Sequence, residues 1–315
     1  MNYSGRKEDC MKITVVGSIN TDFMTNTDRM PYQGETIYGN DFEILYGGKG
    51  ANQAVVAAKI GAEVNMVGAV GDDTIGLSQI ENQRRYDINT EAIEIIEDTT
   101  TGSANIITQD GDNQIIIIPG ANLEITPEIV QKNIHKLDEA DLVMIQNEIP
   151  QETNDFVINY CFNNDIKILY NPAPARLLSE ELIEKVDFIT PNESEFETIF
   201  GKKSTFEEVL SKLPNKVIVT LGQDGAIFHN GEKIVQVAAA QCDKVIDSTG
   251  AGDTFNAGFV VAYLSGLEIE AAIKYANIVS SLTIQKYGAQ SGAPTLEEIM
   301  NHQDYNEDWE IKVQS

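Results

Sequence analysis

The segment from residue 247 to residue 256 (DSTGAGDTFN) combines a flexible loop, a helix start and a carboxylate. Gly250 and Gly252 stand just before a mostly apolar run, Phe255–Leu264, which predicts a tight loop that leads into a helix. Unpaired N–H groups and the dipole at such a helix start favour an anion, and glycines let a ligand approach the backbone. Asp253 lies at this position. Alone, it is more simply explained as a helix cap than as a base beside a phosphate site, and both interpretations stay open here.

A second glycine-rich segment, Gly47-Gly48-Lys49-Gly50, opens another predicted helix that runs to Ile60. The segment is not a Walker A loop, because no serine or threonine follows the lysine. It is not a dinucleotide fingerprint either, because Gln53 occupies the place of the last glycine. Lys49 is either a ligand contact or a solvated charge, and we favour a binding role for the segment.

Most of the chain alternates between short β-branched runs and helical stretches, which predicts βαβ units and a mostly parallel sheet covered by helices on both faces. Strands are predicted at 12–17, 64–70, 142–146, 166–170, 187–189 and 216–220, followed by 226–228 and 233–239. Helices are predicted at 47–60, from 74 to about 86, and at 127–137, 152–162, 179–185, 255–264 and 268–286.

Three further strands, at 36–46, 101–108 and 114–118, interrupt this alternation and predict a small projecting sheet. The sheet would be a lid or an oligomer surface, and the four consecutive isoleucines of its last strand, 115–118, favour burial between two protomers. We therefore expect one α/β domain over residues 12–303, with a lid formed by segments at about 20–46 and 98–120. We expect a disordered leader over 1–11 and a frayed acidic tail over 304–315.

Polar residues follow several of the predicted strands. Asn20 and Asp22 come after the first strand, and later strand ends carry Asn147-Glu148, 171–175 and 191–195. Ligands of open α/β sheets bind beyond the carboxyl ends of the strands, so a site is expected at this edge. Any one of these residues taken singly is better explained by a turn or a cap.

Composition excludes several classes of function. A net charge of −27 and a pI near 4.3 argue against nucleic acids and anionic membranes as partners. Three cysteines without a close pair fit the reduced thiols of a cytoplasmic protein. Three scattered histidines argue against a histidine-based zinc site, and no apolar run approaches the ~18 residues of a membrane span.

These segments together resemble the ribokinase-like (PfkB) carbohydrate kinases, in family order from residue 12 to about 300. The matching motifs are Gly17–Asp22, Gly47–Ala54, Gly71–Asp73, Asn171–Pro174, Asn192-Glu193-x-Glu195, Thr220-Leu221-Gly222-x-x-Gly225, Asp247–Phe255 and Gly288–Gln290. The resemblance implies a three-layer α/β/α sandwich with a small β-sheet lid. It also implies a cytoplasmic homodimer formed through the lid sheets.

The same resemblance implies transfer of the γ-phosphate of ATP to the O5 hydroxyl of D-ribose. Asp253 would be the catalytic base, and the backbone N–H groups of Gly250, Ala251, Gly252 and Asp253 would form an anion hole. This assignment suits the chemistry, since a sugar hydroxyl is a weak nucleophile and phosphoryl transfer needs alignment and charge stabilisation.

The remaining site residues are carried over from the family's motifs. The implied sugar contacts are Asn20, Asp22, Gly48, Lys49, Asn52, Ala104, Ile106, Glu148 and Asp253. The implied nucleotide contacts are Asn192, Thr220, Gly222, Gly225, Gly252 and Asn277. Asn192 and Glu195 would orient water bound to Mg²⁺, and a K⁺ site would use Asp247, Thr249, Thr283, Lys286, Gly288 and either Ser291 or Gly292. The family's hydroxyl ligand falls on Gly292, which is a departure.

Two alternatives stay open. The chain could be another sugar or nucleoside kinase of the same family, such as a fructokinase or a deoxyribose kinase. It could also be a sugar-binding regulator without activity, although Asp253, the two loop glycines and the Asn192/Glu195 pair argue against that.

Overall fold

A computed structural model describes residues 11–109 and 112–313. The predicted leader lies outside these residues except for Met11, which is buried in the core and accepts a backbone hydrogen bond from Glu63. The connection between the predicted strands at 101–108 and 114–118 also lies partly outside them.

The main sheet has six parallel strands in the order β10-β9-β8-β1-β4-β5. They are β1 (Lys12–Val16), β4 (Glu63–Gly71), β5 (Asn89–Ile96), β8 (Leu142–Gln146), β9 (Lys167–Asn171) and β10 (Phe188–Ile189). Chain order reverses around β1, with β8 on one side and β4 on the other, so a crevice is expected beyond its carboxyl end.

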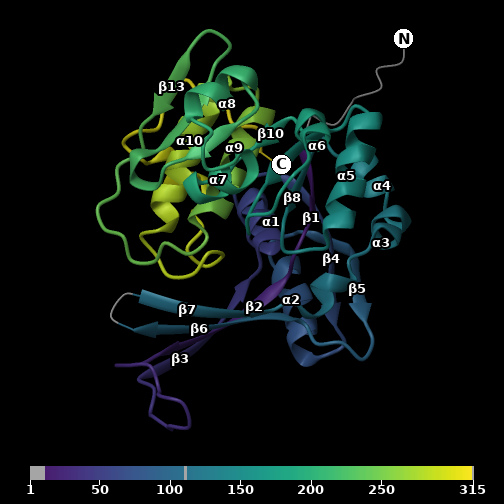
Figure 1. Ribbon diagram of the computed structural model, residues 1–315, viewed down its shortest axis with the longest axis vertical. Helices are drawn as coiled ribbons and strands as arrows, with labels where there is room; N and C mark the ends of the chain where they lie inside the picture. The colour runs from purple at the N-terminus through teal and green to yellow at the C-terminus, as the bar shows by residue number, and fades with distance from the viewer. Residues whose placement is uncertain (1–10, 110–111, 314–315) are drawn as a thin grey trace.

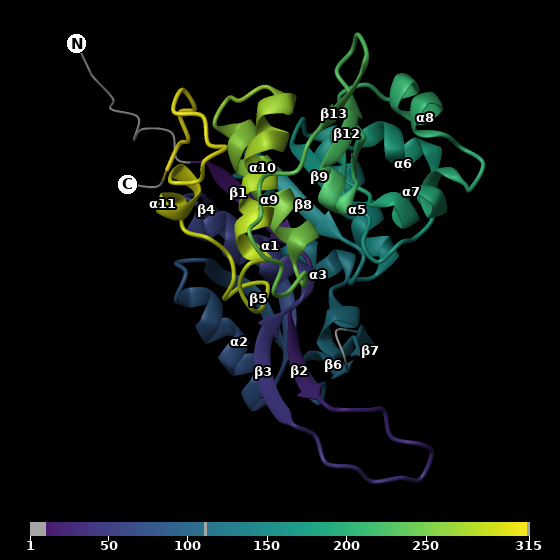
Figure 2. The same cartoon turned by 90° about the vertical axis from the view of Figure 1, so that its left-hand side faces the viewer.

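Helices cover both faces of this sheet (Figures 1 and 2). On β8, Leu142 and Met144 point to one buried cluster and Val143 and Ile145 to the other, as the period of two in a strand requires. The first cluster is completed by α1 (Lys49–Lys59), α2 (Thr74–Arg84), α9 (Ala251–Leu264), α10 (Ile269–Thr283) and α11 (Leu296–Met300). The second is completed by α3 (Pro127–Lys132), α4 (His135–Asp138), α5 (Gln151–Asn163) and α6 (Glu180–Lys185).

A three-stranded antiparallel sheet continues the main sheet beyond β10. It contains β11 (Ile218–Thr220), β12 (Ala226–His229) and β13 (Ile234–Val237), and Val217 bridges to Ile189 of β10. Helices α7 (Glu193–Phe200) and α8 (Phe206–Lys212) pack against it through Phe196, Val209 and Leu210. This region forms one wall of the crevice.

A separate four-stranded sheet projects from the body of the molecule (Figures 1 and 2). Its order is β3-β2-β6-β7, with β2 (Asn20–Asn26), β3 (Asp41–Gly47), β6 (Gly102–Gln109) and β7 (Asp112–Ile118). Strands β2 and β6 are parallel, and each pairs with its outer neighbour in the antiparallel sense. Ile115–Ile118, on the outer strand β7, are each between 46% and 65% exposed in the single chain.

This architecture confirms the predicted fold class of a parallel sheet between two helical layers with a small projecting sheet. Strands β2 and β5 and helices α8 and α11 were not predicted, and the stretch predicted as one helix at 127–137 is divided into α3 and α4. Among the described residues there is no helix with both the length and the apolar character needed to cross a membrane.

The prediction of a frayed tail is wrong for residues 304–313. Tyr305 and Trp309 meet edge to face with ring centroids 5.3 Å apart, and both rings contact the buried Tyr275 of α10. The backbone N–H of Lys312 donates to the Ser265 hydroxyl at 3.1 Å. Aromatic side chains bury large apolar areas, so two of them outweigh the acidic composition on which the prediction rested.

Candidate active site

The loop before α9 ends in a left-handed residue that turns the chain into the helix. Gly250 has φ 78° and occupies the N-cap position, where no side chain caps the helix. The N–H of Ala251 donates to the carbonyl of Ser248 at 3.2 Å. The N–H groups of Gly250, Gly252 and Asp253 have no acceptor among the described residues, so three of the four predicted anion-hole donors are available to a ligand.

The carboxylate of Asp253 does not cap its own helix, which removes the simpler of the two interpretations. It is 5% exposed and accepts two hydrogen bonds from helix α1. Asn52 Nδ2 donates to Oδ2 at 2.9 Å, and Gln53 Nε2 donates to Oδ1 at 3.0 Å. Each oxygen of the carboxylate therefore has one amide donor, and the two bonds together hold the side chain in one orientation.

Glycines at the start of α1 allow the helix to reach this position. Gly48 has φ 88°, and a Cβ there would lie 2.6 Å from the backbone nitrogen of Asn20. A Cβ on Gly50 would lie 2.7 Å from the carbonyl carbon of Gly17. Any side chain at either position would therefore separate α1 from the end of β1, and with it Asn52 and Gln53 from Asp253.

Glu148, which follows β8, is the centre of a second polar group. Its Oε2 accepts from the hydroxyl of Ser18 at 2.5 Å, from the backbone N–H of Lys49 at 3.1 Å and from Asn20 Nδ2 at 3.5 Å. Asn20 Oδ1 in turn accepts from Asn122 Nδ2 at 2.7 Å. The structure thus brings three of the predicted sugar contacts together.

Asp22 lies near this group on strand β2. Burial, followed by the negative charges of Glu148 and Asp253, raises its pKa to about 7, while Lys49 acts in the opposite direction. A Cβ on Gly47 would lie 2.4 Å from the carboxylate of Asp22, so the glycine leaves room for it. Ala104 is paired with Asp22 in the β2–β6 register, and Ile106 is two residues further on the same face.

Lys49 is the cation among these carboxylates. Burial works against its charged form, but the carboxylates of Asp253, Glu148 and Glu195 outweigh burial and raise its pKa. Burial also raises the pKa of Glu195, against the N–H of Asn192 and the charge of Lys49. Lys49 is therefore held as an ammonium group at the floor of the crevice.

Two adjacent cavities lie on either side of the loop before α9. The smaller, about 250 Å³, is lined by Lys49, Asn171, Ala173, Thr190, Asn192, Glu195, Thr220, Ser248, Gly250, Ala251, Gly252, Asp253 and Asn256. The larger, about 470 Å³, is lined by Asn192, Glu193, Ser194, Thr220, Leu221, Gly222, Gly225, Ala251, Gly252, Phe255, Asn277 and Ser280. All residues predicted to contact the nucleotide line the larger one. A Cβ on Gly252 would meet no atom within 4 Å.

Asn192 and Glu195 form a capping box at the start of α7. Asn192 Oδ1 accepts from the N–H of Glu195, and Glu195 Oε2 accepts from the N–H of Asn192, both at 2.9 Å. The box fixes Asn192 where the two cavities meet and Glu195 in the wall of the smaller one. Thr190 Oγ1 and Asn256 Oδ1, in the smaller cavity, are buried without a hydrogen-bond partner among the described residues.

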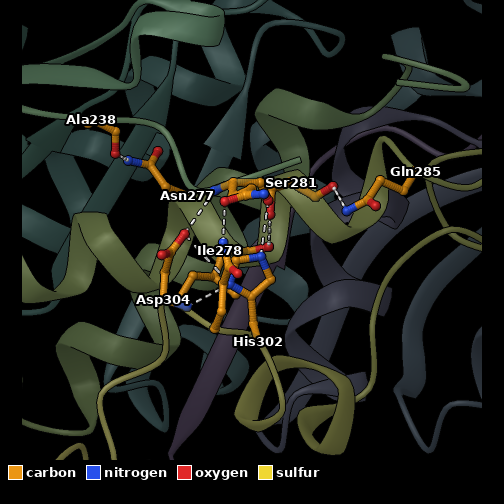
Figure 3. A network of polar contacts seen from close by, with 9 residues as sticks. Ala238, Asn277, Ile278, Ser281, Gln285, His302 and Asp304 are labelled. Atoms are coloured by element: carbon orange, nitrogen blue, oxygen red, sulfur yellow. Dashed lines mark hydrogen bonds and ion pairs between the residues drawn. The ribbon is translucent and has the colours of Figure 1, made fainter. Parts of the chain in front are cut away.

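Asn277 lies on α10 at the far end of the larger cavity. Figure 3 shows its amide donating to the carbonyl of Ala238, with an N–O distance of 2.8 Å. One turn further along α10, the Ser281 hydroxyl donates to the carbonyl of Ile278 at 2.9 Å. Below them His302 and Asp304 form an ion pair at 3.8 Å when the histidine is protonated. The network anchors the segment at 238 to α10 and fixes this end of the cavity.

The predicted K⁺ ligands gather at the C-terminal end of α10. Asp247 accepts from the N–H groups of Thr249 and Gly288, each at 2.9 Å. A Cβ on Gly292 would lie 2.5 Å from the carbonyl oxygen of Gly288 and 3.1 Å from that of Thr283. Gly292 has no hydroxyl to offer a cation, and these distances leave no room for a side chain that would carry one. The hydroxyl of the neighbouring Ser291 donates to the carbonyl of Tyr287 at 2.7 Å.

A comparison with known protein families identifies the family to which the chain belongs. The model of the pfkB family of carbohydrate kinases matches residues 11–296. The chain belongs to this family. The result confirms the resemblance that its motifs indicated.

Relatives and solved structures agree with this assignment. The chain is 47% identical to a ribokinase of Lactococcus lactis over 289 residues, 91% of this chain and 95% of the relative. It is 36% identical to a deoxyribokinase of Salmonella typhimurium, over 94% and 100% of the two chains. The structure of Arabidopsis thaliana ribokinase complexed with ribose and ATP superposes with a TM-score of 0.87 at 31% identity, over 95% and 100% of the two chains.

Several polar residues of this pfkB crevice were not selected from the sequence. Ser18 and Asn122 hold the group around Glu148, and Gln53 holds Asp253. Gln53 stands beside the selected Asn52, so its place in the motif was a signal. Asn122 carried none, because it stands in no motif that separated it from an ordinary buried amide.

The pKa of Asp22 predicts a pH dependence of stability. Between about pH 4 and pH 7 the Asp22 carboxyl group has lost its proton in the unfolded chain but retains it in the folded chain. Raising the pH across this interval therefore favours unfolding. Asp22→Asn removes this dependence. We expect the variant to gain stability relative to the parent as pH rises across this interval, by up to about 4 kcal/mol.

Urea unfolding of both proteins at pH 5 and pH 8 measures this difference. Asp41→Asn, on the exposed end of β3, is the matched control. A stability difference between Asp22→Asn and the parent that stays constant from pH 5 to pH 8 would contradict the raised pKa.

Proposed function

We propose that this protein is an ATP-dependent kinase that phosphorylates D-ribose at O5. The observation that carries the proposal is the buried carboxylate of Asp253, which lies between the available N–H groups of its loop and a cavity that also holds Lys49 and Glu195. The similarity to ribokinases over nearly the whole chain supports ribose as the acceptor.

In the proposed reaction, the carboxylate of Asp253 accepts the proton of the sugar hydroxyl. The hydroxyl oxygen forms a bond to the γ-phosphorus, and the bond from that phosphorus to the oxygen of the ADP leaving group breaks. The N–H groups of Gly250, Gly252 and Asp253 donate to the phosphoryl oxygens as negative charge spreads over them. The N–H of Ala251 would join them only by leaving Ser248, its acceptor in this structure.

The proposed sugar contacts are the side chains that converge between β2, the start of α1 and the end of β8. Asn20, Asp22, Asn52 and Glu148 supply amide and carboxylate groups suited to several hydroxyls, and Gly48 and Lys49 close the floor. Ala104 and Ile106, each 7% exposed, give an apolar wall from the projecting sheet, which we propose acts as a lid.

The proposed nucleotide site is the larger cavity. Thr220, Gly222 and Gly225 line it beside the loop before α9, and Asn277 lies at the end proposed for adenine. The shared lining of the two cavities, which includes Asn192 and Gly252, lets a γ-phosphate in the larger one face Asp253 in the smaller.

The residues present fit Mg²⁺ held with the nucleotide. Among the described residues no three histidine, cysteine, aspartate or glutamate side chains cluster closely enough to bind a metal by themselves. Mg²⁺ in kinases keeps several waters and uses phosphate oxygens with one or two carboxylates, and Glu195, Asn192 and the unpaired oxygens of Thr190 and Asn256 suit such waters. The metal would neutralise phosphate charge.

A K⁺ ion is proposed at Asp247, with the carbonyls of Thr249, Thr283, Lys286 and Gly288. The carbonyl oxygens of Thr283 and Gly288 both lie next to Gly292, which supports a shared ligand position. Without a hydroxyl at 292, the proposed site has one protein ligand fewer than the family pattern, so water is expected to take that place.

A substrate panel tests the proposed function. Ribose, 2-deoxyribose, fructose and a nucleoside are offered with ATP and Mg²⁺, and ADP release is measured with and without K⁺. We expect ribose to give the highest kcat/KM and K⁺ to raise kcat. Preference for deoxyribose would favour the second candidate, which rests on the 36% identity to a deoxyribokinase. Preference for fructose or the nucleoside would contradict both.

Replacing the proposed base gives a second test. Asp253→Asn should lower kcat by about 10²–10⁴-fold, because the hydroxyl loses its proton acceptor. Ribose and ATP should still bind with nearly the parent affinity by calorimetry, since their other contacts remain. Asp243→Asn, an exposed aspartate near the same loop, is the control. Parent activity in Asp253→Asn would remove Asp253 from the role of base.

We also propose a cytoplasmic homodimer that covers the isoleucines of β7. Sedimentation should give twice the mass of the 34.6 kDa chain. Ile116→Lys, at an isoleucine 65% exposed in the single chain, should shift the protein to monomer by burying a charge. Ile95→Lys, on the edge strand β5, should not. A monomeric parent protein would overturn this proposal.

A further inference from the structure

Asp253 is the end of a chain of buried side-chain amides that begins on helix α2. Asn82 Nδ2 donates to Gln290 Oε1 at 2.8 Å, Gln290 Nε2 donates to Asn52 Oδ1 at 3.0 Å, and Asn52 Nδ2 donates to Asp253 at 2.9 Å. All four residues are between 3% and 6% exposed. Helices α1, α2 and α9 each contribute one residue to this chain of hydrogen bonds, and the loop at residue 290 contributes the fourth.

The direction of these bonds is determined by chemistry at one end. Both oxygens of Asp253 accept N–H groups, so Asn52 turns its Nδ2 toward Asp253 and its Oδ1 away. That oxygen then needs a donor, which Gln290 supplies through Nε2. Gln290 is left with an oxygen that needs a donor in turn, and Asn82 supplies it. Reversing any one amide would place two donors or two acceptors against each other.

A second chain reaches the other carboxylate oxygen from the sheet. Gln146, the last residue of β8, donates through Nε2 to Gln53 Oε1 at 2.7 Å, and Gln53 Nε2 is shared between Asp253 and Asn171. A Cβ on Gly17 would lie 2.1 Å from Gln146 Oε1, so the glycine at the end of β1 makes room for this amide. Each oxygen of Asp253 is thus approached by one amide whose orientation is fixed from behind.

We propose that Gln290 and Asn82 are positioning residues for the reaction: through Asn52 they hold the carboxylate of Asp253 in the rotamer that faces the sugar hydroxyl. Neither residue lines the two cavities described above, so neither contacts substrate there. The inference rests on the proposed function of Asp253 as base. A base displaced by a small rotation loses rate while the binding of the distant nucleotide is unaffected.

The test uses near-isosteric replacements that remove the amide. Gln290→Met leaves Asn52 without its donor, and we expect kcat to fall about 10-fold with the KM for ATP within twofold of the parent. Asn82→Leu leaves Gln290 able to donate but free to rotate, and should lower kcat about 3-fold. Because both act through one chain, the double variant should lose about 10-fold and not about 30-fold.

Gln83→Met is the matched control. Gln83 neighbours Asn82 on α2, is fully buried and has no hydrogen-bond partner for its amide among the described residues. Its replacement should leave kcat within twofold of the parent. Thermal unfolding of every variant separates loss of rate from loss of stability, and Asn82→Leu keeps the test open if Gln290→Met does not fold.

Assays use whichever sugar the parent protein phosphorylates, so the positioning role is tested even if the preferred sugar is not ribose. A kcat of Gln290→Met equal to that of the parent, or losses that multiply in the double variant, would overturn the positioning role of Gln290 and Asn82. Equal losses in Gln290→Met and Gln83→Met would do the same. Full activity in Asp253→Asn would instead overturn the proposed function on which this positioning role rests.

Discussion

The two hydrogen bonds from Asn52 and Gln53 to Asp253 are the interaction on which the rest of the structure depends. They join the first turns of α1 and α9, about two hundred residues apart in the chain. A buried carboxylate without partners would be costly, so the helices must meet closely enough for both amides to reach it. Gly48 and Gly50 against the end of β1 permit that approach, and the parallel order of the sheet directs both helix starts to the same edge.

The crevice places positive groups where a strongly acidic protein would otherwise repel an anionic substrate. Asp22, Glu148, Glu195 and Asp253 all influence the pKa of the single Lys49 among them. The backbone N–H groups before α9 add a positive potential without a further basic side chain. Because the negative groups surround the position proposed for the sugar and the N–H groups face the position proposed for the phosphate, the two ends of the crevice differ in electrostatic character.

The sequence predicted the layers of the fold and most residues of the crevice, because glycines and polar strand ends leave local patterns. It did not predict β5, whose polar and apolar residues alternate weakly, or the packing of Tyr305 and Trp309 beneath an acidic tail. The capping box that Asn192 and Glu195 form at the start of α7 was not anticipated either. The amides behind Asp253 come from four separate segments, and no local pattern connects Asn82 with Gln290.

The parallel pairing of β2 with β6 has a consequence for how the chain folds. It joins Asn20 to Gly102, with β3, α1, β4, α2 and β5 between them. A contact across so long a loop is entropically unfavourable until the intervening units have collapsed onto the main sheet. The pairing of β2 with β6 therefore depends on the units between them having formed, and the projecting sheet is tied to the main sheet through the chain as well as through its contacts.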